Sequence, residues 1–122
     1  MVYEYSATVV DIVDADSVVL DVNLGFRLTW RAPFRLYGPD IEGKMGLNAP
    51  ELKTPEGVKA RDFLAQLLAS HSHNLMAHTK KDRKEKFGRY LVTLYGSLFE
   101  GEAAENINRL LIDSGHAVLR KY

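Results

Sequence analysis

The feature that most constrains the fold is an alternation of apolar and polar residues from residue 17 to residue 24, broken only at Val19. The apolar members are Val18, Leu20, Val22 and Leu24. A period of two predicts a strand with one buried face. A run rich in β-branched and aromatic residues, 3–13, precedes it across the polar connection Asp14-Ala15-Asp16. Gly25 and a second alternating run follow it, so we predict an antiparallel meander of three strands.

The third strand of this meander is expected to cover residues 26–37, with Pro33 interrupting its pairing. Residues 38–46 contain three glycines and Pro39, which predicts an exposed loop. This loop carries Asp40 and Glu42.

A helix is predicted to begin at Pro55, because Thr54 can cap it and Pro55 suits the first helical position. Its apolar stripe is Ala60, Phe63, Leu64, Leu67 and Leu68. Strands are expected at 74–79 and 90–95, separated by a basic loop. A second helix is expected at 102–114, with an extended tail at 117–119. The inward residues expected on that helix are Ala103, Ile107, Leu110 and Leu111.

Three strands, a helix and two strands is the element order of a five-stranded OB-fold barrel with helices, an α+β fold. The 122 residues suffice for one domain, 1–122. The chain has no cysteine, which excludes disulfides and thiolate metal sites. It has neither a secretory signal nor an apolar run long enough to span a membrane, so we expect a cytoplasmic location and no membrane partner. A secreted form trimmed of its leader would look the same and is the alternative. We also expect a monomer.

The formal net charge is zero, but residues 78–89 carry six basic and two acidic side chains. A local basic segment on a neutral chain suits transient contact with phosphates. Several other polar side chains fall at predicted strand ends and in loops. They are Asp14, Asp16, Arg35, Asn48, Glu51 and Arg89.

Five segments of the chain, in order, resemble the successive motifs of the staphylococcal nuclease-like (thermonuclease) family. They are Val13-Asp14-Ala15-Asp16-Ser17-Val18, Phe34-Arg35-Leu36-Tyr37-Gly38, Asn48-Ala49-Pro50-Glu51, Lys86-Phe87-Gly88-Arg89 and residues 108–115. The resemblance extends from about Tyr5 to Tyr122. It implies an OB-fold nuclease that hydrolyses DNA and RNA with calcium, at low sequence specificity, and leaves 3′-phosphates.

The resemblance also implies a metal site. Asp16 would be a direct Ca²⁺ ligand, Ala49 would offer its backbone carbonyl, and Asn48 stands where the family usually has a second ligating aspartate. Calcium prefers oxygen ligands, so these groups suit it. Because Asn48 lacks a carboxylate, Asp40 or Glu42 is an alternative source of negative charge at the metal.

The catalytic residues implied by the resemblance are Arg35 and Arg89, which would grip the scissile phosphate, and Glu51, which would position or deprotonate the attacking water. The planar fork of an arginine contacts two phosphate oxygens at once. The residues expected to contact the nucleic acid are Lys84, Lys86, Phe87 and Tyr122.

Two other functions stay open. One is an OB-fold module that binds nucleic acid with weak or no catalysis, which Asn48 and the inserted loop favour. The other is a scaffold domain for protein partners, for which two arginines and Glu51 would be unnecessary. Asn108 is expected to satisfy backbone groups rather than to touch substrate.

Overall fold

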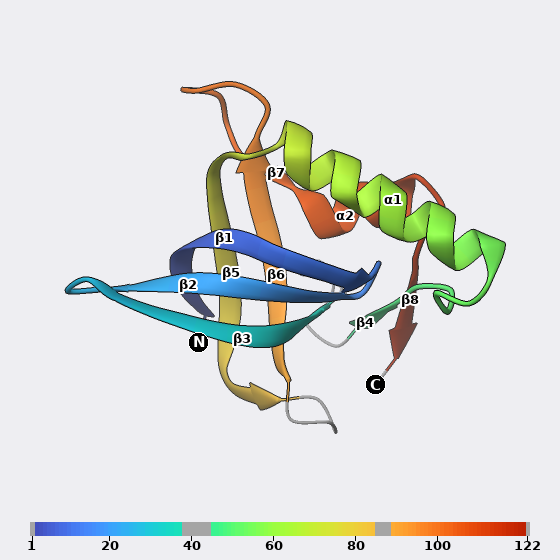
Figure 1. Ribbon diagram of the computed structural model, residues 1–122, viewed down its shortest axis with the longest axis horizontal. Helices are drawn as coiled ribbons and strands as arrows, with labels where there is room; N and C mark the ends of the chain where they lie inside the picture. Colours follow the sequence, from blue (N-terminus) through green and yellow to red (C-terminus); the bar gives the residue numbers. More distant parts are fainter. Residues whose placement is uncertain (1, 38–44, 85–88, 122) are drawn as a thin grey trace.

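The computed structural model describes residues 2–37, 45–84 and 89–121 (Figure 1). Three antiparallel strands form the predicted meander: β1 (Val2–Asp14), β2 (Ser17–Gly25) and β3 (Leu28–Leu36). β1 then pairs with β5 (His73–Lys84), which pairs with β6 (Tyr90–Ser97). A parallel pairing of β3 with β6 closes the five strands into a barrel. The predicted OB-type barrel with helices is confirmed.

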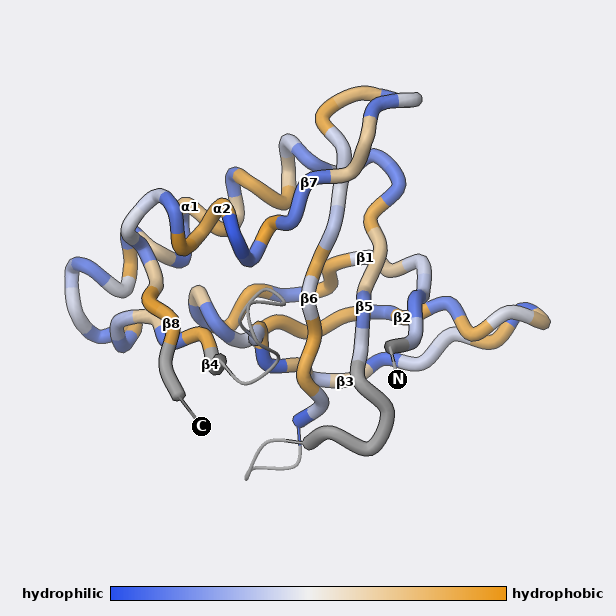
Figure 2. Tube along the Cα trace, turned by 180° about the vertical axis from the view of Figure 1, so that it is seen from behind, coloured by the Kyte–Doolittle hydropathy of each residue, from blue (hydrophilic) through white to orange (hydrophobic). Residues whose placement is uncertain are grey.

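The barrel interior is filled by the inward residues of the meander and of the last two strands. Val18, Leu20 and Val22 are at most 2% exposed, as their alternation predicts. Figure 2 shows hydrophobic and hydrophilic residues alternating along these strands. Leu24 was expected on the same inner face, but it is 44% exposed. The β2–β3 hairpin extends beyond the barrel, so its last residues have no opposite wall to contact (Figure 1).

The hairpin turns at Phe26 and Arg27, so the third strand starts at Leu28 and not at residue 26. Both turn residues have positive φ, 54° and 64°, which is the backbone of a type I′ hairpin. Asparagine and glycine usually fill such positions because other residues are strained there. Phe26 is 96% exposed, so packing within the described structure does not offset this strain.

Pro33 does not interrupt the third strand as predicted. It lies opposite Val19 within a continuous ladder between β2 and β3. β3 gains β6 as its second neighbour only from Phe34 onward. The missing N–H of Pro33 therefore removes no hydrogen bond to β6, and a proline is tolerated there.

Helix α1 (Pro55–Ser70) begins where the sequence predicts. The Thr54 hydroxyl accepts a hydrogen bond from Gly57 N–H (3.0 Å), and Pro55 occupies the first turn. Ala60, Leu64 and Leu68 are buried against the barrel. Phe63 and Leu67 are partly buried beside them. The apolar stripe therefore fastens this helix across one end of the barrel.

Helix α2 (Ile107–Asp113) is shorter than predicted. Residues 105–106 form the short strand β7 (Glu105–Asn106) against β6, and Ala103 is exposed rather than inward. Asn106 caps the helix by accepting a hydrogen bond from Arg109 N–H (3.0 Å). In the part of the chain that is described, no helix is both long and apolar enough to cross a membrane.

A second, two-stranded sheet was not predicted. β4 (Met45–Asn48) pairs antiparallel with β8 (Val118–Lys121), where the sequence suggested a loop and a free tail. The prediction of a loop for the basic segment was also wrong for residues 80–84, because β5 continues to Lys84 with Lys84 opposite Tyr90. In both places the partner strand comes from a distant part of the chain, which local propensity does not reveal.

Asn108 is fully buried and joins three backbone groups that meet beneath α2. Its amide nitrogen donates to the carbonyls of Tyr37 (2.6 Å) and Val92 (3.0 Å), and its side-chain oxygen accepts from Leu94 N–H (3.1 Å). Tyr37 follows β3, whereas the other two residues belong to β6. The prediction that Asn108 satisfies backbone groups is confirmed, and the contacts brace the closure of the barrel.

We therefore expect Asn108→Ala to lower the free energy of unfolding by about 3 kcal/mol, because buried backbone groups lose their partners. Urea unfolding would measure the loss. The helix-cap variant Asn106→Ala serves as the control, with an expected loss of about 1 kcal/mol. Equal losses in the two variants would contradict the bracing role.

A second prediction concerns the hairpin turn. Phe26→Asn should raise the free energy of unfolding by about 0.5–1 kcal/mol, because asparagine tolerates positive φ and Phe26 buries almost nothing. The matched control is Phe99→Asn, an exposed phenylalanine outside the left-handed region, which should change stability little. Destabilisation by Phe26→Asn in thermal or urea unfolding would refute the strain.

Candidate active site

Asp16 lies in the two-residue turn between β1 and β2, and its side chain is only 10% exposed. Its Oδ2 accepts a hydrogen bond from Ala49 N–H (3.2 Å) and lies 3.5 Å from Arg35 Nη2. The backbone of Asp16 is also fixed, since its carbonyl accepts from Leu36 N–H (2.9 Å). The turn thus holds a buried carboxylate between β3 and the residues after β4.

Arg35 reaches the same place from β3. Its Nη2 donates to the Leu47 carbonyl (3.1 Å) and pairs with Asp16. The Arg35 side chain is 21% exposed. Both contacts that it makes with described residues use Nη2. An arginine has further N–H donors on its other nitrogens. This geometry leaves room for an anion to bind the rest of the fork.

Arg89 lies directly before β6, and the Ser17 hydroxyl connects it to Asp16. Its Nη1 donates to Ser17 Oγ (2.5 Å), and Ser17 lies next to Asp16 and opposite Arg35 in the β2–β3 ladder. We refer to Asp16, Ser17, Arg35 and Arg89 as the arginine–aspartate cluster. The structure brings together three of the four residues on which the predicted chemistry depends.

Asn48 ends β4 and Ala49 follows it, and both are half-buried. Their neighbour Leu47 is fully buried and anchors the segment. Because Ala49 N–H binds Asp16, the segment is held against the β1–β2 turn. Figure 1 shows β4 beside this end of the meander.

The Glu51 backbone is fixed, but its side chain is not buried in the cluster. Its carbonyl accepts from Thr54 N–H (2.9 Å) and from the Thr54 hydroxyl (2.7 Å). A side chain at Gly57 would overlap this carbonyl, since a Cβ there would lie 1.8 Å from it. The Glu51 carboxylate, however, is 72% exposed and pairs with Lys53 (3.1 Å). This structure therefore does not join it to Asp16 and the arginines.

Burial raises the pKa of Asp16 to about 6. The neighbouring Asp14 carboxyl adds to the shift by hydrogen bonding and by its charge, whereas Arg35 and Ala49 N–H oppose it. Asp14 also accepts from Asp16 N–H (3.1 Å). Two acids in contact resist ionising together. Burial and the Asp14 carboxyl together therefore outweigh the effect of Arg35 and Ala49 N–H on the pKa of Asp16.

These groups fit a hard cation in their chemistry. Asp14 and Asp16 offer carboxylate oxygens and Asn48 offers an amide oxygen, which are the donors that calcium prefers. The raised pKa of Asp16 is what a bound cation would reverse. Among the described residues, no three His, Cys, Asp or Glu side chains form a metal cluster. A cation here would therefore depend on the amide, a carbonyl, water or substrate for its other ligands.

Several predicted residues lie outside the described ranges. They are Lys86, Phe87, Tyr122, Asp40 and Glu42. Lys84 is the last residue of β5. The predicted roles of these residues in binding nucleic acid or metal stay predictions.

Ser17 was missed by the sequence reasoning. It is 4% exposed, and its hydroxyl contacts both Asp16 and Arg89. A lone serine at the start of a strand carries no signal of this kind. The only sequence signal for Ser17 is that it directly follows Asp16 in the segment Val13-Asp14-Ala15-Asp16-Ser17-Val18.

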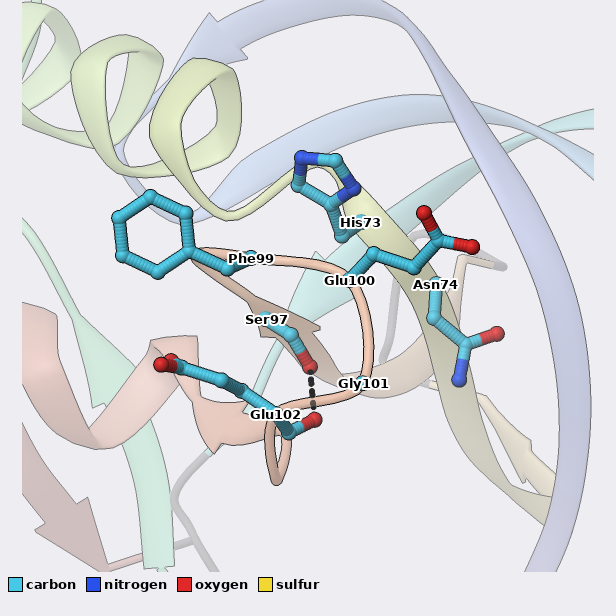
Figure 3. A pocket seen from close by; sticks show the side chains of 7 residues that line it. All are labelled: His73, Asn74, Ser97, Phe99, Glu100, Gly101 and Glu102. Atoms are coloured by element: carbon cyan, nitrogen blue, oxygen red, sulfur yellow. Dashed lines mark hydrogen bonds between the residues drawn. The ribbon is translucent and has the colours of Figure 1, made fainter.

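A hollow of about 430 Å³ lies at the other end of β6, away from the arginine–aspartate cluster (Figure 3). It is lined by His73, Asn74, Ser97, Phe99, Glu100, Gly101 and Glu102. Its lining includes two glutamates and no arginine or lysine, so it does not suit a phosphate. The cluster is the better candidate site for a phosphodiester.

One comparison with known proteins identifies the family of the chain. The staphylococcal nuclease homologue family matches residues 44–122, which is more than half of the chain and includes Asn48, Glu51 and Arg89. Asp16 and Arg35 precede the matched segment, but their side chains contact its residues Ala49 and Leu47. No curated protein matches the chain. The match confirms the resemblance and with it the fold: the chain belongs to the staphylococcal nuclease homologue family.

Proposed function

We propose that this protein is a calcium-dependent nuclease that hydrolyses phosphodiester bonds of DNA and RNA with low sequence preference, leaving 3′-phosphates. Membership of the family relates the chain to nucleases and to nucleic-acid substrates. The observation that carries the proposal is the convergence of Asp16, Arg35 and Arg89, which come from three separate strand ends.

The arginines supply the main phosphate-binding chemistry in this proposal. Negative charge builds up on the phosphoryl oxygens as the attacking water bonds to phosphorus and the bond to the 5′ oxygen breaks. Preorganised guanidinium groups stabilise that charge more strongly than bulk water does. Arg35 supports this role because its contacts with Leu47 and Asp16 fix its position before substrate arrives.

The cation would be held by Asp16, the Asn48 amide and the Ala49 carbonyl, with Asp14 beside them. When bound, calcium supplies positive charge to the phosphate under attack. A neutral asparagine in place of a second carboxylate lowers the charge of the site. We therefore expect weaker calcium binding than in a site with two ligating carboxylates.

Glu51 is the proposed residue that positions or deprotonates water. Its carbonyl is fixed by Thr54 at the start of α1, so only its side chain would have to rotate toward the cluster. The pair with Lys53 is largely exposed and therefore contributes little resistance to that rotation. Catalytic contacts commonly tighten only once substrate is bound.

A second candidate is a module that binds nucleic acid without turnover. The observation that favours it is the exposed Glu51 carboxylate, which pairs with Lys53 instead of the cluster. Binding of a single-stranded oligonucleotide without any cleavage, unchanged in Glu51→Gln, would support this candidate over the nuclease.

The first test is cleavage of single-stranded DNA and RNA with calcium and with excess chelator. We expect cleavage only with calcium, and end-group analysis should find 3′-phosphates. Arg35→Gln should lower kcat by roughly 10²–10³, since one transition-state donor is lost.

The matched control for this test is Arg31→Gln. Arg31 lies on the same strand, but it pairs with Asp21 (2.7 Å) on the exposed face. Its replacement should leave kcat within about twofold of the parent, because surface ion pairs contribute little. No cleavage by the folded protein under either condition would refute the nuclease.

A further prediction concerns the energetic cost of the buried carboxylate. Because the pKa of Asp16 is raised in the folded state, the folded protein binds more protons than the unfolded chain between about pH 4 and 6. The free energy of unfolding should therefore fall as pH rises through this range. Asp16→Asn should abolish that fall and raise stability at pH 7 by about 2 kcal/mol, while abolishing cleavage.

Urea unfolding at several pH values, with chelator present, measures this effect. Asp21→Asn is the control, since Arg31 lowers the pKa of Asp21 and its replacement should not stabilise the protein. Loss of stability in Asp16→Asn at pH 7 would show that the ionised carboxylate is favourable instead.

A further inference from the structure

The Ser17 hydroxyl contacts two site side chains in opposite hydrogen-bonding roles. It donates to Asp16 Oδ1 (3.4 Å) and accepts from Arg89 Nη1 (2.5 Å). A hydroxyl has one proton to donate and lone pairs to accept with, so both capacities are used. Ser17 links the buried carboxylate to an arginine 72 positions away in the chain.

The position of Ser17 is set by the barrel and not by Arg89. It is the first residue of β2, where it lies opposite Asp14 of β1 and opposite Arg35 of β3. It is 4% exposed, so bulk water competes little for its hydroxyl. The hydroxyl is therefore a fixed acceptor on which a mobile side chain can be oriented.

The two arginines are held in different ways. Arg35 binds the Leu47 carbonyl and approaches Asp16 directly. Arg89 precedes β6, and its contact with Asp16 runs through the Ser17 hydroxyl. Fixing a long arginine side chain costs conformational entropy, which a preformed acceptor offsets before substrate binds.

We propose that Ser17 is a positioning residue that couples Arg89 to Asp16, so that both arginines are oriented from one carboxylate. This inference rests on the proposed nuclease function. Ser17 contributes no proton or bond to the reaction, because its hydroxyl is buried and engaged on both sides.

A double-mutant cycle on kcat tests the coupling. Ser17→Ala should lower kcat about tenfold and change KM for an oligonucleotide less, because Arg89 loses orientation at the transition state. Ser17→Thr keeps the hydroxyl and should recover most of the activity. In an Arg89→Ala background, Ser17→Ala should have no further effect.

The matched control is Ser97→Ala at the far end of β6. Ser97 is also buried, and its hydroxyl donates to the Glu102 carbonyl (2.9 Å), as Figure 3 shows. Its replacement should leave kcat unchanged and should not depend on Arg89. If Ser17→Ala and Arg89→Ala act additively, or if Ser17→Thr is no better than Ser17→Ala, the positioning role is wrong.

A measurement without substrate separates this inference from the proposed function. In NMR spectra of ¹⁵N-arginine protein, the Arg89 guanidinium should show restricted rotation that Ser17→Ala loosens and Ser97→Ala preserves. A protein that fails to cleave nucleic acid while showing this pattern would refute the nuclease and keep the coupling. A protein that cleaves while Arg89 rotates freely would refute the coupling alone.

Discussion

Between Phe34 and Leu36, β3 runs parallel beside β6, and this short ladder closes the sheet into a barrel. The ladder is extended by Tyr37 N–H, which donates to the Val92 carbonyl (3.1 Å), and it is braced by Asn108. Closure places Arg35 opposite Leu91, two residues along the chain from Arg89. This pairing brings the end of β3, which carries Arg35, beside the start of β6, which Arg89 precedes.

The site that results is made of strand ends and turns rather than of strand interiors. Asp16 belongs to a turn, Ala49 follows β4, and Arg89 precedes β6. The barrel fixes where these segments start and stop, so that Asp16 is buried whereas Ala49 and Arg89 stay partly exposed. Holding the acidic pair of Asp14 and Asp16 there opposes folding at neutral pH, as the raised pKa of Asp16 indicates.

Much of the fold followed from local patterns. The alternation of apolar and polar residues predicted which face of β2 points inward, and Thr54 with Pro55 predicted where α1 begins. Both signals act over a few neighbouring residues, so they can be read from the sequence. The β4–β8 pair, the extension of β5 and the late start of α2 were missed because each depends on a partner strand distant in sequence. The convergence of Asp16 with Arg35 was expected from the motifs, whereas the exposure of Glu51 and the contacts of Ser17 were visible only in three dimensions.

The pairing of β4 with β8 makes the order of synthesis matter. Val118–Lys121 are made long after Met45–Asn48, yet they form the partner strand of that segment. Until they have left the ribosome, β4 has no partner strand, and Asn48, the residue before the Ala49 N–H that binds Asp16, lacks its partner Val118. During synthesis both arginines would therefore emerge before the strand pair that supports the Asn48–Ala49 end of the site can form.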